Sequence, residues 1–169
     1  MTTEQTLYEV GTAFIRAFDT LEDEAHISLR ATSCTHTFAP ASISPPPPMT
    51  NAEPAAHLAK LQLIMNSFPV TAKEIHVNVP KRQVLIWATA VAEFKDEVKG
   101  LKEGEDGTEW DYVGEYMFFL TVDEEGRISR VVEFVDSLGT KRVWGLMSRA
   151  WENAGMVQKL FEGGKAGEV

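Results

Sequence analysis

The sequence predicts one α+β domain, in which antiparallel strands pack against helices. Apolar residues recur at helical spacing over residues 7–21 and again over residues 138–151. Between these segments, residues 75–97 alternate between apolar and polar side chains, and residues 109–137 have the pattern of a long β-hairpin. Strands that follow each other through short turns pair antiparallel, so this order of elements gives an α+β fold.

Two helices are expected at the start of the chain. The first should lay one apolar face on the core, and Thr2 or Thr3 offers an N-cap. Residues 22–31 are expected to form a second, shorter helix with Ile27 on its buried side. Residues 35–38 then form either a short strand or an extended entry into the next loop.

A proline-rich loop follows at residues 42–50. Its four consecutive prolines force an extended, non-helical segment, which we expect on the surface near the rim of a pocket. Thr50 or Asn51 then caps a third helix, whose apolar stripe continues to Phe68.

The rest of the chain is expected to be strands and one closing helix. Strands are predicted at residues 75–79, 83–97, 109–122 and 127–137, with a turn at 123–126. Helical spacing resumes at Leu138. We expect residues 1–162 to form a single domain and the Gly-rich residues 163–169 to be a disordered tail.

The strand at residues 109–122 is apolar on both faces. One face carries Trp110, Tyr112, Tyr116, Phe118 and Leu120, and the other carries Val113, Met117 and Phe119. A sheet with one face in water alternates between apolar and polar residues, so both faces of this strand should be covered. Helices can cover one face. We expect a second copy of the chain to cover the other, which predicts a homodimer through the sheet.

Composition and charge exclude several classes of protein. The formal net charge of -9 argues against binding to nucleic acid or to an anionic membrane surface. No apolar run approaches the roughly 20 residues that span a bilayer, and the N-terminus lacks the pattern of a signal peptide. Cys34 is the only cysteine, and no Cys/His cluster has metal-site spacing. We therefore expect a cytoplasmic protein without a metal or other cofactor.

Two tyrosines on the hairpin are candidates for catalysis. Tyr112 and Tyr116 lie on one strand and project from the same face, and Gly114 between them leaves room for an approach to the backbone. Both rings could simply fill the core, with their hydroxyls bonded to backbone groups. A pocket wall is an equally good interpretation, because the pair flanks a glycine on the face that the helices cover.

Glu133 is the candidate for proton transfer. It lies among apolar residues on the return strand, so it is either on a solvated stripe or buried at a cost. Buried in a pocket, it would suit a general acid or base. Asp136 is the competing carboxylate, although it could instead cap the following helix. Alternation places Glu133 and Asp136 on opposite faces, so at most one lines the pocket unless a bulge intervenes.

Arg30 is the candidate cation. Near the end of the second predicted helix, it is either a favourably placed charge at the helix C-terminus or a catalytic group. His36 is a candidate for substrate binding, whereas His26, His57 and His76 show no partner pattern. The sequence has no nucleophile elbow, Cys/His protease context or phosphate-binding loop. The chemistry indicated is acid–base catalysis, without metal or covalent catalysis.

Three segments carry a family likeness. They are residues 30–38 (RATSCTHTF), 112–116 (YVGEY) and 131–137 (VVEFVDS). In this layout the chain resembles the SnoaL-like proteins of the nuclear-transport-factor-like superfamily, and more narrowly their fungal branch in natural-product pathways. The likeness extends to about Trp151. It implies a cone-shaped, curved, antiparallel or mixed sheet packed on three to four helices, with a deep pocket and usually a dimer.

The resemblance also implies an activity. Characterised members of the fungal branch isomerise or cyclise terpenoid, polyketide or alkaloid intermediates without a cofactor, and some direct a semipinacol-type rearrangement of an oxidised indole. Matched onto this chain, the pattern gives Arg30, Tyr112, Tyr116 and Glu133 as the polar, catalytic pocket set. The same superfamily includes pure binding proteins, so the fold does not fix the function.

The leading hypothesis is a cofactor-independent isomerase or cyclase that acts on a hydrophobic polycyclic intermediate of secondary metabolism. Glu133 would move the proton, as an acid or as a base, while Arg30 and the two tyrosines stabilise developing negative charge. The residues expected to bind the substrate and shape the cavity are His36, Trp87, Trp110 and Phe118.

Two alternatives use the same pocket. The first is a small-molecule-binding dimer without chemistry of its own, which a Glu133 side chain turned to solvent would favour. The second is a dehydratase, which His36 or His76 opening into the cavity near Asp136 would favour.

Overall fold

The computed structural model describes residues 2–100 and 109–156 and confirms the α+β class. Its α-helices are α1 (Glu4–Arg16), α2 (Asp23–Ile27), α3 (Ala52–Gln62) and α4 (Ser137–Asn153). Its strands are β1 (Arg30–Ala39), β2 (Met65–Ser67), β3 (Val70–Asn78), β4 (Gln83–Val91), β5 (Glu93–Phe94), β6 (Val113–Val122) and β7 (Ile128–Val135). The predicted tail at residues 163–169 lies outside the described residues.

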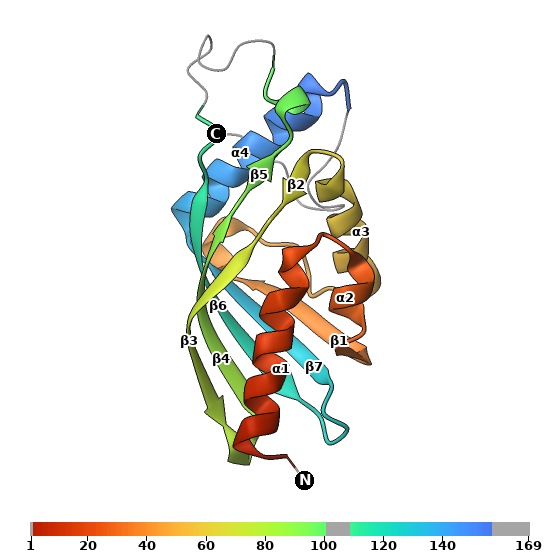
Figure 1. Cartoon of the computed structure of the whole chain (residues 1–169), viewed down its shortest axis with the longest axis vertical. Helices are drawn as coiled ribbons and strands as arrows, with labels where there is room; N and C mark the ends of the chain where they lie inside the picture. The colour runs from red at the N-terminus through yellow and green to blue at the C-terminus, as the bar shows by residue number, and fades with distance from the viewer. Residues whose placement is uncertain (1, 101–108, 157–169) are drawn as a thin grey trace.

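Five strands form one curved sheet in the order β1-β7-β6-β4-β3, and β2 pairs with β5 in a separate two-stranded ribbon. β1 runs parallel to β7, whereas the other neighbours in the main sheet are antiparallel. Helix α1 lies along the inner face of the sheet, α2 and α3 stand beside it, and α4 crosses near one end (Figure 1). The sheet is therefore mixed, and the helices leave its outer face open.

Helix α1 packs against the inner face of the sheet and forms a large part of the core there. Thr3 caps it, because the Thr3 hydroxyl accepts a hydrogen bond from the Thr6 N–H and the Thr6 hydroxyl accepts one from the Thr3 N–H. Phe14 on its buried face meets Phe118 of the sheet edge-on, with ring centroids 5.2 Å apart. Gly11 lets the helix approach closely, since a Cβ there would lie 2.9 Å from a methyl group of Val84.

The second helix is shorter than predicted, and Arg30 does not belong to it. Helix α2 ends at Ile27 and buries His26, and the chain enters β1 at Arg30. The second helix is confirmed, but its predicted end at residue 31 was wrong, because β1 forms by pairing with β7, a contact distant in sequence that local helical spacing cannot reveal. Residues 35–38 accordingly lie in a long strand rather than a short one.

The hairpin of β6 and β7 is confirmed. Tyr116 lies opposite Val135, and Leu120 lies opposite Val131. The residues predicted for the inner face are all buried, namely Trp110, Tyr112, Tyr116, Phe118 and Leu120. After β7, Asp136 caps α4 by accepting hydrogen bonds from the N–H groups of Leu138 at 3.1 Å and Gly139 at 3.0 Å. Both carboxylate oxygens of Asp136 are thus used to cap α4, so Asp136 is no longer the competing candidate for proton transfer.

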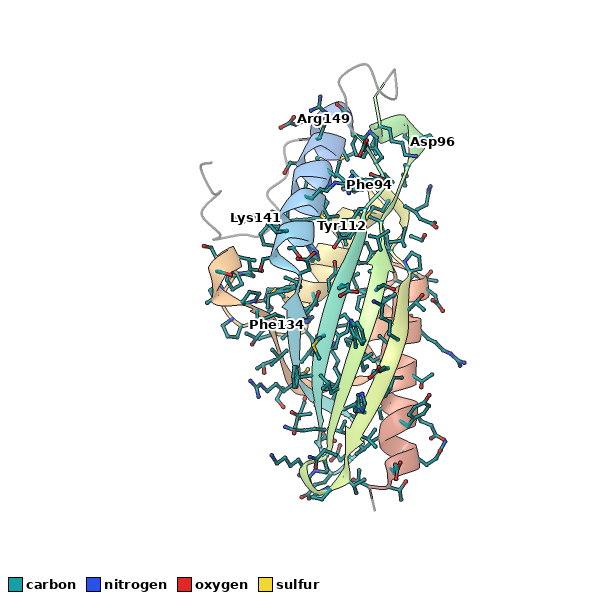
Figure 2. The ribbon with its side chains drawn as sticks, turned by 90° about the vertical axis from the view of Figure 1, so that its left-hand side faces the viewer. Phe94, Asp96, Tyr112, Phe134, Lys141 and Arg149 are labelled. Carbon is teal, nitrogen blue, oxygen red and sulfur yellow. The ribbon has the colours of Figure 1, made fainter. Side chains whose placement is uncertain are left out.

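The outer face of the sheet is apolar and exposed in the single chain (Figure 2). Trp87, Met117 and Phe134 lie side by side in one row across β4, β6 and β7. A second row of the same strands consists of Leu85, Phe119 and Val132.

Within residues 2–100 and 109–156, no helix is long and apolar enough to cross a membrane.

Candidate active site

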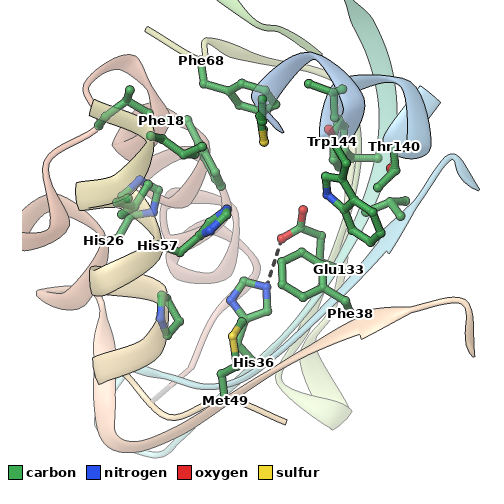
Figure 3. Close-up of a pocket in the computed structure, with 18 of the residues that line it drawn as sticks. Phe18, His26, His36, Phe38, Met49, His57, Phe68, Glu133, Thr140 and Trp144 are labelled. Atoms are coloured by element: carbon green, nitrogen blue, oxygen red, sulfur yellow. Dashed lines mark hydrogen bonds and ion pairs between the residues drawn. The ribbon is translucent and has the colours of Figure 1, made fainter. Parts of the chain in front are cut away.

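A cavity lies between the inner face of the sheet and the helices (Figure 3). The empty space in and in front of it is about 850 Å³, a figure that includes open solvent at its mouth. Most of its wall is apolar, with residues such as Phe18, Leu21, Phe38, Phe68 and Trp144. The polar residues in the wall are His26, Arg30, His36, His57, Tyr116, Glu133 and Thr140.

Three of the polar side chains form a hydrogen-bonded chain. Arg30 Nη2 lies 3.2 Å from His36 Nδ1, and His36 Nε2 lies 3.0 Å from Glu133 Oε2. A guanidinium can only donate, so His36 Nδ1 accepts the hydrogen bond from Arg30. In a neutral ring the proton is then on His36 Nε2, which donates a hydrogen bond to Glu133 Oε2. Figure 3 shows the second carboxylate oxygen of Glu133 directed into the cavity.

The parallel pairing of β1 with β7 brings these residues together. Phe38 lies opposite Glu133, and His36 opposite Val131, so the inner-facing side chains of the two strands meet. The register shifts between Arg30, opposite Ile128, and Thr35, opposite Arg130. The extra residues of β1 form a bulge. The bulge brings Arg30 closer to His36 along the strand and turns it toward the His36 ring.

Arg30 is a buried cation with spare donors. It is 4% exposed, and among the described residues its Nε and Nη1 have no hydrogen-bond partner. Burial lowers the pKa of Arg30, while the nearby Cys34 and Glu133 raise it. A buried charge without direct pairing is costly, and unpaired N–H groups at a cavity wall are suited to bind an oxygen atom of a ligand.

The two tyrosines are in contact but only one lines the cavity. Their hydroxyl oxygens lie 2.7 Å apart, and Tyr116 belongs to the cavity wall while Tyr112 lies behind it. Burial is the main reason why the pKa of both phenols is raised, and the effect is largest for Tyr116. Gly114 permits the contact, because a Cβ at this position would collide with the Tyr112 hydroxyl. The group that approaches the backbone at Gly114 is thus Tyr112 itself.

Three predicted cavity residues lie elsewhere, which corrects their assignment. Trp87 is on the outer face of the sheet, 37% exposed, with the Lys73 ammonium 4.4 Å from its ring centroid. Trp110 packs edge-on against Phe94 in a second apolar cluster, with centroids 5.0 Å apart. Phe118 stacks behind Tyr116 at 5.8 Å and supports the wall without forming it.

Sequence reasoning missed three polar wall residues. His57 follows Pro54 at helical spacing and precedes Leu61, so it belongs to the inward stripe of α3, a signal that the pattern did contain. Thr140 is on the first turns of α4, and its buried hydroxyl has no partner among the described residues. His26 is on the one-turn helix α2, where no periodicity can be read.

No family model matches the chain, and no curated protein matches it by sequence. Solved structures do match. AusH from Aspergillus nidulans has a TM-score of 0.67 and 23% identity, over 81% of this chain and 88% of AusH. BvnE pinacolase from Penicillium brevicompactum has a TM-score of 0.72 and 22% identity, over 88% of this chain and 97% of BvnE. PrhC from Penicillium brasilianum has a TM-score of 0.71 and 19% identity, over 90% of this chain and 94% of PrhC.

The chain has the fold of these fungal proteins. The resemblance in fold predicted from the hairpin and the β1 segment is thereby confirmed. At this level of identity the likeness concerns the fold, so the site must be argued from the residues of this chain.

Gly114→Ala should destabilise the protein by roughly 1–3 kcal/mol, because the new methyl group displaces Tyr112 and separates the two hydroxyls. Denaturant unfolding would measure the effect. Gly145→Ala is the matched control: Gly145 is exposed in α4 with open space around its Cβ position, so alanine should stabilise the helix by up to about 1 kcal/mol. Equal stability of the two variants would contradict the close contact at Gly114.

The stability of the protein should fall between about pH 6.5 and pH 4 because of His26. Its pKa is lowered from 6.5 to about 4, first by burial and then by the nearby charge of Arg30. The unfolded chain therefore binds a proton in this window that the folded chain does not, which costs on the order of 3 kcal/mol by pH 4. His26→Gln should flatten the pH dependence of the unfolding free energy, while His76→Gln, at an exposed position, should not. An unchanged slope in His26→Gln would contradict the assignment.

Proposed function

We propose that this protein is an isomerase or cyclase that acts by acid–base chemistry on a hydrophobic polycyclic intermediate of secondary metabolism. The observation that carries the proposal is the chain Arg30–His36–Glu133, which lies in the wall of a largely apolar cavity. The fold shared with fungal proteins, one of them named a pinacolase, supports it. A semipinacol-type rearrangement of an oxidised indole alkaloid and an isomerisation of a terpenoid, meroterpenoid or polyketide are the reactions we consider first.

Glu133 has the position of a general base. Its Oε2 accepts a hydrogen bond from His36 Nε2–H, and its other oxygen is available to a substrate in the cavity. In an isomerisation, Glu133 would remove a proton from carbon, and the electron pair would move into the adjacent carbonyl oxygen. The same proton would then return to a different carbon, so that no atom is gained or lost.

Arg30 and Tyr116 would stabilise the intermediate. The negative charge that develops on the carbonyl oxygen needs hydrogen-bond donors. Arg30, whose Nε and Nη1 have no partner among the described residues, and Tyr116 both line the cavity. Tyr112 would act through Tyr116, by holding its hydroxyl in place. The donors are fixed before the substrate binds, so little reorganisation is needed during the reaction.

A dehydratase is the second candidate. The observation that favours it is the His36–Glu133 pair in the cavity, a histidine–carboxylate arrangement that can take a proton from carbon and return one to a departing hydroxyl. The carboxylate beside His36 is Glu133 rather than Asp136, and His76 pairs with Glu74 on the surface.

Mass spectrometry separates these functions. The purified protein would be incubated with the metabolites that accumulate when its gene is deleted from the source organism. An isomerase or cyclase gives a product of the same mass, and a dehydratase gives a product lighter by one water. Binding without any product would support the small-molecule-binding alternative and overturn both enzymatic candidates.

Glu133→Gln should lower turnover by about 10²- to 10⁴-fold, the usual contribution of a positioned general base, while the fold is kept. The assay is the conversion just described, with circular dichroism as the check on folding. Glu115→Gln is the matched control, because Glu115 is on the neighbouring strand but points outward and pairs with Lys73. Turnover near the wild-type value in Glu133→Gln would rule out the mechanism.

We also propose that two copies of the chain meet through the outer face of the sheet. The rows of Trp87, Met117 and Phe134 and of Leu85, Phe119 and Val132 make an apolar surface over three strands, and isolated proteins rarely expose one of this kind. The ion pair of Lys73 with Glu115 lies at its rim, where charges cost little.

Phe119→Lys should shift the protein from dimer to monomer. The dimer interface would then bury two lysine charges, one from each chain, without partners. Sedimentation velocity measures the change. Tyr8→Lys is the control: Tyr8 on α1 is 48% exposed and Phe119 is 47% exposed, but α1 lies along the inner face of the sheet. A wild-type protein that sediments as a monomer would contradict the proposal.

A further inference from the structure

His26 is a buried histidine in the cavity wall that the proposed mechanism does not use. It is 4% exposed, and its ring packs edge-on against Phe18 with centroids 4.5 Å apart. Figure 3 shows it on the same side of the cavity as Phe18 and His57, across from Glu133 and Trp144. Its position therefore places a polar ring on the wall opposite the base.

The hydrogen bonds of His26 define which ring nitrogen is protonated. The backbone carbonyl of Ala17 accepts a hydrogen bond from the ring, and Nε2 has no partner among the described residues. The donor to Ala17 is thus Nδ1–H, and in the neutral ring Nε2 holds a lone pair. The ring stays neutral because burial and the Arg30 charge lower its pKa to about 4. Nε2 is a hydrogen-bond acceptor without a donor.

An unpaired buried acceptor is costly, so a molecule that donates a hydrogen bond to Nε2 should bind more tightly than one that cannot. The neighbouring protein groups do not supply a donor. Phe18 is apolar, and no group among residues 2–100 and 109–156 donates a hydrogen bond to Nε2. A molecule held in the cavity can supply the donor.

We infer that His26 Nε2 accepts a hydrogen bond from a neutral donor on the substrate, either a hydroxyl or an aromatic N–H. This inference rests on the proposed function, because it concerns the substrate of the same cavity. A cationic donor is excluded by the adjacent charge of Arg30. The substrate is then an apolar polycycle with two polar features: an acceptor oxygen for Arg30 and a neutral donor for His26.

His26 selects the substrate rather than reacting with it. A ring that stays neutral down to about pH 4 is a weak base at neutral pH, and Glu133 is better placed to take a proton. A site built to pair with a donor rejects analogues that lack it, because the buried acceptor is then left unpaired. The residue should thus affect affinity for donor-bearing molecules.

Paired probes test the inference. Calorimetry would compare 2-naphthol with 2-methoxynaphthalene, and indole with 1-methylindole; within each pair, methylation removes the donor. Naphthalene, which has neither donor nor methyl group, separates loss of the hydrogen bond from steric exclusion. For the donor type that His26 recognises, we expect binding about tenfold tighter than for its methylated partner, and naphthalene should bind as weakly as the methoxy compound. The pair that shows this ratio identifies the donor as O–H or N–H.

The tenfold ratio should fall to about one in His26→Phe, and His26→Gln, which keeps an acceptor, should retain part of it. His76→Phe is the matched control and should leave the ratio unchanged, since His76 is on the surface. Equal affinities within both pairs, a ratio that persists in His26→Phe, or no binding of any probe would overturn the inference. Should His26→Phe fail to fold, His26→Leu and His26→Gln provide the same comparison.

Failure of the inference and failure of the proposed function are distinguishable. If the inference alone is wrong, the protein still converts its metabolite in a Glu133-dependent way but does not discriminate between the probes. If the proposed function alone is wrong, the probes are discriminated through His26 but no metabolite is converted.

Discussion

The parallel pairing of β1 with β7 is the constraint on which the site depends. It joins His36 to Glu133, which are 97 residues apart in sequence, and it creates the bulge that turns Arg30 toward His36. The hairpin with β6 holds β7 in place, and the β6 face then adds Tyr116 to the same wall. If β1 were detached from the sheet, the cavity would keep Glu133 and Tyr116 but lose Arg30 and His36.

The polar groups of the site are costly to bury, and the fold compensates only part of that cost. In the part of the chain that the structure describes, Arg30 has no direct carboxylate partner, and His36 lies between it and Glu133. The remaining donors of Arg30 and the acceptor of His26 lack partners among the described residues. Unsatisfied groups of this kind persist where a ligand completes them, because each would otherwise reduce stability. Helix α4, capped by Asp136, supplies Thr140, Val143, Trp144 and Met147 to the wall around these groups.

Sequence patterns predicted the parts of this structure that depend on neighbouring residues. Alternation along the hairpin correctly separated Tyr116 and Phe118 from Met117 and Phe119, since a strand has a period of two whatever it pairs with. The same alternation along β4 buries Ile86 and Ala88 and so turns Trp87 outward. Assigning Trp87 to the cavity gave more weight to its residue type than to its position.

Features that depend on contacts between distant segments could not be predicted in this way. Helical spacing at residues 22–31 concealed the start of β1, because only the partner strand makes that segment extended. His26 and Thr140 are cavity residues through the packing of α2 and α4 against the sheet, and no local pattern encodes the space between elements. The residue pattern and the resemblance to the SnoaL-like proteins both indicated Arg30 and Glu133, but neither gave the geometry that relates them.

That geometry bears on the question, open from sequence alone, whether Glu133 acts as an acid or as a base. Arg30 donates to His36 Nδ1, so the imidazole must present its other proton to Glu133 Oε2. A carboxylate accepts this hydrogen bond more strongly than a carboxylic acid does, because charge-assisted hydrogen bonds are the stronger ones. The positive charge at the far end of the chain acts in the same direction. For the proposed mechanism, this hydrogen bonding therefore favours Glu133 as the base of the first step, which takes a proton from the substrate and later returns it.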